Sequence, residues 1–280
     1  MSARRALPVT LMMWAGFAFL YLPILSLIIF SFNSNKLVTV WAGFSTQWYG
    51  TLLHNQQILD AAWLSLRIGL VNACLATVLG TLVAVCLTRF GPFRGRALLS
   101  GLATAPLVMP EVITGLSLLL MFVAMEQAFG WPAGRGTLTI VIAHVTFSMA
   151  YVAVIVRSRL IEMDPAIEEA AMDLGAKPAK VFFVITLPII APALVSGWLL
   201  AFTLSLDDLV IASFVSGPGS STLPMVIYSK VRLGLSPEIN ALATLMISVV
   251  ALGVVIAGLV MARQEKTRRR DEQLAVAANK

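Results

Sequence analysis

Three carboxylate side chains lie within long apolar stretches of this sequence, where a charged group needs a partner. They are Glu111, which follows Pro110, and the adjacent Asp207 and Asp208. No Lys or Arg within the apolar stretches is placed to neutralise them, because Arg67 falls near the end of its stretch. A charge at the depth of a bilayer is costly and is a candidate functional group by default. Uncompensated negative charge of this kind suits a cation that exchanges its hydration for carboxylate contacts.

Each carboxylate also has a purely structural interpretation. The two aspartates are rotated by about 100° from each other if they lie on one helix. One of them can serve only to cap the backbone where a helix frays before the glycine-rich residues 216–219. Glu111 can serve only to stabilise the start of a half-helix through the helix dipole. The sequence leaves both interpretations open.

Aromatic rings near the carboxylates extend the candidate site. Tyr151, Trp198 and Phe202 can contact an ammonium group through a cation–π interaction, although packing and interfacial anchoring are commoner uses of such rings. His144 is expected to be a hydrogen-bonded packing residue. No Cys and His spacing predicts a metal site, and no residue set predicts covalent catalysis.

The composition determines the class of protein that must position these groups. Of the 280 residues 59% are hydrophobic and only 12% are charged, which is too few charges to cover a soluble surface. Several apolar runs reach the length of about 20 residues that is needed to cross a bilayer. The fold class is therefore an all-α membrane protein, with one transmembrane domain over residues 1–280.

The apolar runs predict six spans. They cover about residues 11–32, 64–88, 98–125, 137–157, 188–214 and 240–262. The third span contains Pro106 and Pro110, which remove helix hydrogen bonds and predict a kink or a break inside the bundle. A kink that serves packing alone is the alternative.

The basic residues predict the orientation of the spans. If the N-terminus is cytoplasmic, most of the 20 Lys and Arg side chains fall in cytoplasmic segments. Both termini are then expected in the cytoplasm. The basic run at 263–270 is expected to bind anionic lipid headgroups of the membrane and not nucleic acid.

The longest predicted cytoplasmic loop, residues 158–187, predicts two short helices. Asp164 suits an N-cap with Pro165 at the first helical position, and Gly175 suits the left-handed residue that ends such a helix. Pro178 can start the second helix, which runs towards the fifth span.

On the first of these helices small apolar side chains form a shallow strip with acidic neighbours. The strip consists of Ala170, Ala171 and Leu174, and the neighbours are Glu168, Glu169 and Asp173. Such a surface suits a groove of another protein. A helix that lies on the lipid headgroups is the alternative.

The loop resembles the EAA loop of the inner-membrane permease subunits of binding-protein-dependent ABC importers. The matching residues are Glu169-Ala170-Ala171, then Gly175 after three residues, then Ile185-Thr-Leu-Pro188 after nine more. The loop also precedes the penultimate span, where that family keeps it. Within the family the chain looks closest to spermidine/putrescine permeases, and to the putrescine subunits among them. The stretches that carry this resemblance are 32–34, 105–115, 205–214 and 237–243.

The resemblance implies a type I importer permease fold and uptake of polyamines, putrescine or spermidine, through the bacterial inner membrane. The coupling helix that it implies, seated in a groove of a cytoplasmic ATPase, consists of Glu169, Ala170, Ala171, Asp173, Leu174 and Gly175. The carboxylates and aromatic rings described above predict the substrate path, which we expect to be lined by Asp207, Asp208, Glu111, Tyr151 and Trp198.

The resemblance also implies three partners: a second permease subunit, an ATPase dimer and a periplasmic polyamine-binding protein. The sequence contains no GxxxxGK[ST] phosphate loop, so ATP and Mg²⁺ are expected on the ATPase and no cofactor is expected on this chain. The chain is expected to be a transport subunit and not an enzyme.

Other classes remain as alternatives. An importer permease for an amino acid, an anion or a sugar would share the coupling loop. A secondary transporter would predict inverted repeats and broken helices in corresponding positions of both halves, and proline interrupts only the third span. A membrane sensor would predict a recognisable soluble signalling segment.

Overall fold

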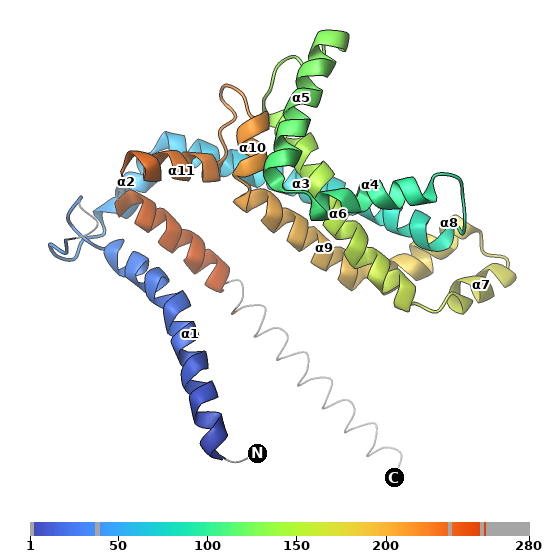
Figure 1. Ribbon diagram of the computed structural model, residues 1–280, viewed down its shortest axis with the longest axis horizontal. Coiled ribbons are helices and arrows are strands. Elements are labelled where there is room, and N and C mark those ends of the chain that lie inside the picture. The colour runs from blue at the N-terminus through green and yellow to red at the C-terminus, as the bar shows by residue number, and fades with distance from the viewer. Residues whose placement is uncertain (1–2, 37–39, 235–236, 253–254, 256–280) are drawn as a thin grey trace. The chain divides into compact units, whose positions relative to one another are not determined.

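The computed structural model describes residues 3–36, 40–234, 237–252 and 255 of the chain (Figure 1). It divides into two compact units. The first unit comprises residues 1–56 and 229–280, and the second comprises residues 57–228. Within the described ranges the regular secondary structure is helical, with one isolated bridge between Asn33 and Phe44. The expected all-α class is confirmed.

The first unit contains two helices near its N-terminus, α1 (Ala3–Phe30) and α2 (Gln47–His54), and an apolar helix at Pro237–Leu252. The fully buried Asn33 organises the loop after α1. Its Nδ2 donates to the carbonyl of Val40 at 2.7 Å, and its Oδ1 accepts from the N–H of Ala42 at 3.0 Å. These bonds satisfy loop backbone groups that no helix pairs.

In this unit an ion pair joins the last turn of α11 (Leu223–Leu233) to the start of the 237–252 helix. Glu238 accepts from Asn55 Nδ2 at 2.6 Å, and its other oxygen lies 3.2 Å from Lys230 Nζ. The three side chains therefore tie together the end of α2, α11 and the later helix.

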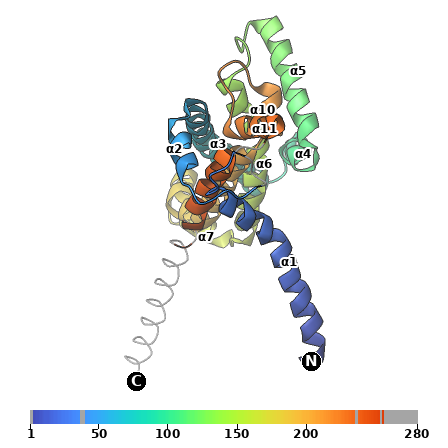
Figure 2. The same cartoon turned by 90° about the vertical axis from the view of Figure 1, so that its left-hand side faces the viewer.

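The second unit contains the remaining helices (Figures 1 and 2). They are α3 (Gln56–Arg89), α4 (Arg96–Val108), α5 (Glu111–Phe129), α6 (Thr137–Glu162), α7 (Ala166–Asp173), α8 (Pro178–Val181), the π-helical turn η1 (Phe182–Thr186), α9 (Leu187–Asp207), α10 (Val210–Val215) and α11 (Leu223–Leu233), whose last turn belongs to the first unit. The chain turns sharply between α4 and α5, and in both views α5 extends away from α3, α6 and α9.

Glycines allow three helices of this unit to approach closely around the fully buried Val152 of α6. A Cβ atom on Gly80 of α3 would lie 2.8 Å from the Val152 Cβ, and one on Gly197 of α9 would lie 3.2 Å from its Cγ1. Small residues at such crossings are typical of membrane helix packing. Val152 belongs to one of two apolar cores; the other gathers around Phe122, Ile140 and Ile211.

Among the residues that the structure describes, five helices are long and apolar enough to cross a membrane. They are Val9–Phe30, Gln56–Arg89, Glu111–Phe129, Thr137–Glu162 and Pro178–Asp207. Arg96–Val108 and Pro237–Leu252 are shorter apolar helices. The sixth predicted span, 240–262, falls partly outside the described residues. The orientation of the termini stays a prediction.

The structure differs from continuous helices in two of the predicted spans. The third span, predicted at 98–125, is broken and not only kinked. Met109 and Pro110, between α4 and α5, are both extended with ψ of 135°. The fifth, predicted at 188–214, begins its helix at Pro178 and breaks at Asp208, whose ψ is 122°. Proline explains the first break; an aspartate side chain explains the second, as described below.

Candidate functional site

The ends of α7 are set by local chemistry, as the sequence predicts. The carboxylate of Asp164 accepts from the N–H of Ala166 at 2.9 Å. At the other end Gly175 has a φ of +86°, and the N–H of Ala176 reaches back to the carbonyl of Ala171 at 3.1 Å. This hydrogen bond and the positive φ form a Schellman cap, which favours glycine. Pro178 begins α8, as predicted.

The predicted apolar strip of α7 lies open to its surroundings. No residue of α7 is buried, and Leu174, which follows it, is 90% exposed. Ala170 is exposed and Ala171 is half-buried, while Glu169 and Asp173 beside them are exposed. An apolar strip of this kind, exposed in a single chain and flanked by acids, is typical of a surface that another protein covers.

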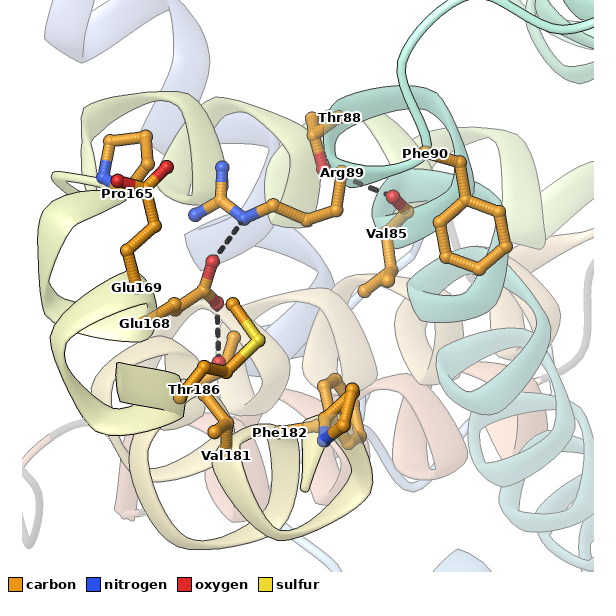
Figure 3. A pocket seen from close by; sticks show the side chains of 12 residues that line it. Val85, Thr88, Arg89, Phe90, Pro165, Glu168, Glu169, Val181, Phe182 and Thr186 are labelled. Carbon is orange, nitrogen blue, oxygen red and sulfur yellow. Dashed lines mark hydrogen bonds and ion pairs between the residues drawn. The ribbon is translucent and has the colours of Figure 1, made fainter. Parts of the chain in front are cut away.

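The adjacent Glu168 points in a different direction and is bound within the chain (Figure 3). Its Oε2 lies 2.7 Å from the Nε of Arg89, the last residue of α3, and its Oε1 accepts from the hydroxyl of Thr186 in η1 at 2.5 Å. The Arg89 and Glu168 side chains are only 20% and 13% exposed. We call these three residues the Arg89–Glu168–Thr186 network.

The network lines a cavity of about 490 Å³ between the end of α3, α7 and η1 (Figure 3). The other lining residues are Val85, Thr88, Phe90, Pro165, Glu169, Met172, Pro178, Val181 and Phe182. Sequence reasoning missed Arg89 and Thr186 and took Glu168 only as a flanking charge. No local pattern could have paired these residues, because they lie far apart in the chain.

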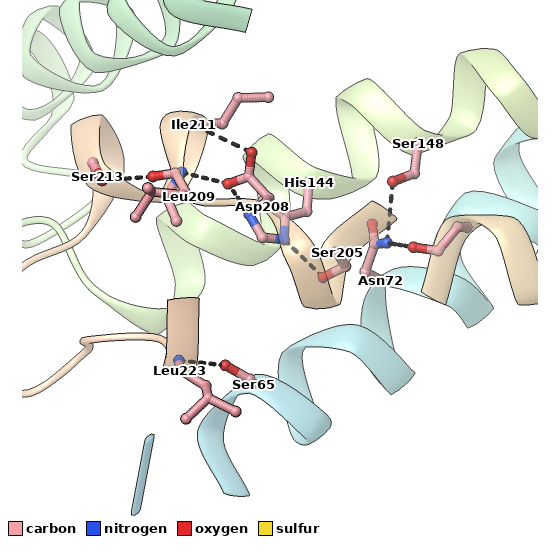
Figure 4. Close-up of polar contacts among 12 residues, drawn as sticks. Ser65, Asn72, His144, Ser148, Ser205, Asp208, Leu209, Ile211, Ser213 and Leu223 are labelled. Carbon is pink, nitrogen blue, oxygen red and sulfur yellow. Dashed lines mark hydrogen bonds and ion pairs between the residues drawn. The ribbon is translucent and has the colours of Figure 1, made fainter. Parts of the chain in front are cut away.

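The second candidate region is the break between α9 and α10 (Figure 4). The carboxylate of Asp208 accepts from the N–H groups of Ile211 at 3.3 Å and Ala212 at 2.7 Å, so it caps α10. The same carboxylate lies 3.1 Å from His144 Nε2, and His144 Nδ1 lies 2.7 Å from the hydroxyl of Ser205. The side chains of His144 and Asp208 are 2% and 8% exposed.

The two predicted aspartates therefore have different environments. Asp208 has both carboxylate oxygens engaged, as the capping interpretation predicts for one of the pair. Asp207, the last residue of α9, is exposed. His144 is hydrogen-bonded and buried, as predicted from the sequence.

Glu111 lies in the first turn of α5, exposed and directly after the break at Pro110. One turn later a Cβ atom on Gly115 would lie 2.7 Å from the ring of Phe214 and 3.3 Å from the Cα of Ile211, both in α10. The start of α5 therefore packs closely against the helix that Asp208 caps. The two helix breaks meet in this part of the second unit.

The predicted aromatic residues lie in different cores. Tyr151 is half-buried, packs 5.2 Å from the Phe147 ring and borders the core that contains Ile211. Trp198 stacks on Phe202 at 5.4 Å and borders the core around Val152. Both rings thus have packing partners within the chain.

A buried amide that sequence reasoning missed links three helices (Figure 4). Asn72 of α3 is fully buried and donates to the Ser148 hydroxyl of α6 at 3.1 Å and to the Ala201 carbonyl of α9 at 2.8 Å. Polar links of this kind hold membrane helices together where hydrophobic burial gives no preference.

Comparison with known proteins identifies relatives over most of the chain. Residues 76–270 match the family described as "Binding-protein-dependent transport system inner membrane component". The chain is 65% identical over 260 residues to the putrescine transport system permease protein PotI of Escherichia coli K12, which covers 93% of this chain and 92% of that protein. It is 42% identical over 257 residues to the spermidine/putrescine transport system permease protein PotC of the same organism, covering 91% and 94%.

A solved structure shares the fold at low sequence identity. It is a bacterial alginate ABC transporter in complex with an alginate pentasaccharide-bound periplasmic protein. The TM-score is 0.67 at 17% identity, covering 90% of this chain and 91% of that chain.

Proposed function

Because the chain belongs to the family of binding-protein-dependent transport system inner membrane components, we propose that it is a permease subunit of an ATP-driven polyamine importer. Putrescine is the proposed main substrate and spermidine the alternative. Among the features of the structure, the exposed carboxylate of Asp207, at the end of an apolar helix long enough to cross a membrane, carries this proposal.

The end of α9 suits a cation for two reasons. Asp207 is exposed, whereas the neighbouring Asp208 already holds His144 and the start of α10. In addition, the last carbonyl groups of a helix lack partners within it and carry the negative end of its dipole. A primary ammonium group can thus exchange water for a carboxylate and carbonyl oxygens in one place.

Glu111 is the second proposed carboxylate of the path. It is exposed and lies one turn from Gly115, which packs against α10. A diamine has a charge at each end, so two carboxylates on neighbouring helices suit it better than one. Tyr151 and Trp198 are proposed ring contacts of the same path, although each also serves packing.

The proposed partners follow from the exposed surfaces. The strip on α7 around Glu169 and Leu174 is proposed to lie in a groove of a cytoplasmic ATPase dimer, which binds ATP and Mg²⁺. The window of α1 within Val9–Phe30 buries none of its residues, so lipid or a second permease subunit is proposed to cover it. A periplasmic polyamine-binding protein delivers the substrate.

The proposed mechanism is alternating access. ATP binding closes the ATPase pair, and the movement of α7 displaces the membrane helices so that the path opens towards the binding protein. ATP hydrolysis then restores the state in which the path opens towards the cytoplasm. The driving force comes from the different affinity of ATP for the two states of the assembly.

The first experiment is uptake of labelled putrescine and spermidine. Cells that lack this chain but retain the other importer components are supplied with it, and a sample depleted of ATP is the control. ATP-dependent restoration for one polyamine supports the proposal and identifies the substrate. If the chain reaches the membrane and restores neither, the polyamine assignment is wrong, and amino acids, anions and sugars are the next substrates to test.

A further inference from the structure

The attachment of α7 to the rest of the chain does not depend on apolar burial. None of its eight residues is buried. Its own ends are capped locally, by Asp164 at the start and by the turn at Gly175 after it. The helix can therefore keep its shape while its position relative to the membrane spans depends on other contacts.

The Arg89–Glu168–Thr186 network supplies such contacts. Arg89 ends α3, Glu168 lies in the first turn of α7, and Thr186 lies in η1, which continues directly into α9. One carboxylate thus joins α7 to two membrane helices at once, with 2.7 Å to the guanidinium and 2.5 Å to the hydroxyl. Both contacts involve the charged carboxylate of Glu168, the first as an ion pair and the second as a hydrogen bond, and contacts to a charged group are stronger than contacts between neutral groups.

The burial of the network makes it costly to break. Thr186 is 2% exposed, and Glu168 is 13% exposed. Within the part of the chain that the structure describes, Nε and Nη2 of Arg89 are buried and make no hydrogen bond, so the guanidinium depends on its ion pair with Glu168. Removal of Glu168 would leave this guanidinium without its opposite charge beside an apolar cavity.

The π-helical geometry of η1 is a second sign that this contact matters. The turn Phe182–Thr186 is π-helical, so its backbone hydrogen bonds span one residue more than those of the α-helices on either side. It places the Thr186 hydroxyl at Glu168 (Figure 3). Short π-helical segments of this type are frequent at functional sites.

We propose that Arg89, Glu168 and Thr186 are positioning residues that make α7 move as one body with α3 and α9. When the ATPase displaces α7, the membrane helices α3 and α9 would then move with it, and the loop would not absorb the movement by bending. This inference rests on the proposed function of α7, and it assigns different tasks to neighbouring acids. Glu168 binds inward to the permease, and the exposed Glu169 is left for the partner.

The test measures coupling and not activity alone. In membranes that contain the complete importer, the ratio of substrate taken up to ATP hydrolysed is compared between the original chain and variants. Arg89→Gln and the isosteric Glu168→Gln are expected to lower this ratio about tenfold, and Arg89→Lys, which keeps the charge, to lower it less. If one of the two Gln variants is not inserted into the membrane, the other is used for the measurement.

A matched control is available on α6. The Arg159–Glu162 pair, 3.3 Å apart and 45% and 63% exposed, is an exposed ion pair that the network does not include. Arg159→Gln is expected to leave the ratio unchanged. An unchanged ratio in Arg89→Gln and Glu168→Gln would overturn the proposal, as would loss of the ATPase from the assembly, because the network would then serve attachment and not transmission.

A second measurement needs no substrate and so separates this inference from the polyamine assignment. Spin labels are placed on Cys86 of α3 and on Ala166→Cys of α7, with Cys74→Ser to remove the other thiol. In the assembled importer we expect one narrow distance distribution that ATP does not change. Arg89→Gln should broaden it. A narrow distribution in the variant, or an ATP-dependent change with the network intact, would contradict movement as one body.

Discussion

The 158–187 loop and the α9–α10 break each present two adjacent acids, and in each pair one acid is held by the chain while the other is exposed. In the loop Glu168 is held and Glu169 is exposed; at the break Asp208 is held and Asp207 is exposed. The held acids differ in what holds them. Arg89 on a distant helix holds Glu168, whereas His144 and two N–H groups of the following helix hold Asp208.

This difference indicates which part of the structure depends on Asp208 and which depends on Glu168. The carboxylate of Asp208 replaces missing backbone hydrogen bonds, so the break and α10 depend on it. Glu168 makes no bond that α7 needs for its own shape, so it determines only where α7 lies. A held acid can thus maintain local structure or fix the position of an element, and its neighbour is left for a partner or a substrate.

The largest expected effect comes from breaking the end of α7. At Gly175, with φ of +86° and open space around the missing Cβ, a substitution meets backbone strain and no clash. Gly175→Val should cost about 2 kcal/mol or more at this turn, and uptake should fall about thirtyfold while the protein stays in the membrane. Gly175→Asn, which tolerates this conformation, should retain most uptake. Normal ATP-driven uptake by the Val variant would contradict the coupling role.

The next effect tests the exposed acid at the break. Asp207→Asn should lower polyamine uptake about tenfold, because a charge-assisted contact to the substrate is lost. The melting temperature of the purified chain should stay unchanged, since the side chain is exposed. Unchanged uptake by Asp207→Asn would exclude Asp207 from the substrate path.

The held acid at the break should give the opposite pattern. Asp208→Ala removes the cap of α10 and leaves His144 without one of its two partners, so stability should fall by about 1–2 kcal/mol. Uptake should fall with the amount of folded protein. A variant with full thermal stability and defective uptake would move Asp208 to the substrate path.

The smallest effect is expected at the exposed acid of the loop. Glu169→Gln should leave the stability of this chain unchanged and weaken retention of the ATPase a few-fold, as expected for one exposed charged contact. Co-purification of the ATPase at increasing salt measures this. Weakened retention by Glu168→Gln but not by Glu169→Gln would reverse the roles assigned to the two acids.

The class of fold and the family were predictable from the sequence because their signals are local or cumulative. The apolar runs predict an all-α membrane protein, and the Asp164-Pro165 and Gly175 signals predict both ends of α7. The family match over residues 76–270 confirms the resemblance and the type I importer permease fold. The prolines near 110 predict an interruption of the third span.

The remainder depends on contacts that the sequence does not express locally. The apolar run continues past Asp208, so hydropathy extends that span to residue 214 although the helix ends at Asp207. Only the position of His144 and the N–H groups of α10 reveals which aspartate is the cap. The partners Arg89 and Thr186, and the links made by Asn72, come from helices that meet only in the folded chain.

The π-helical turn η1 also determines how the residues before it are rotated about the axis of the long helix that contains it. Pro178–Asp207 is a continuous helix of 30 residues, and η1 lies near its loop end. Deletion of one residue within 182–186 would convert the turn to ordinary helix and rotate everything before it by about 100° relative to the span. Thr186 and the residues that follow Gly175 would then lie on different sides of this helix. The extra residue therefore determines the direction in which the loop leaves the membrane helix.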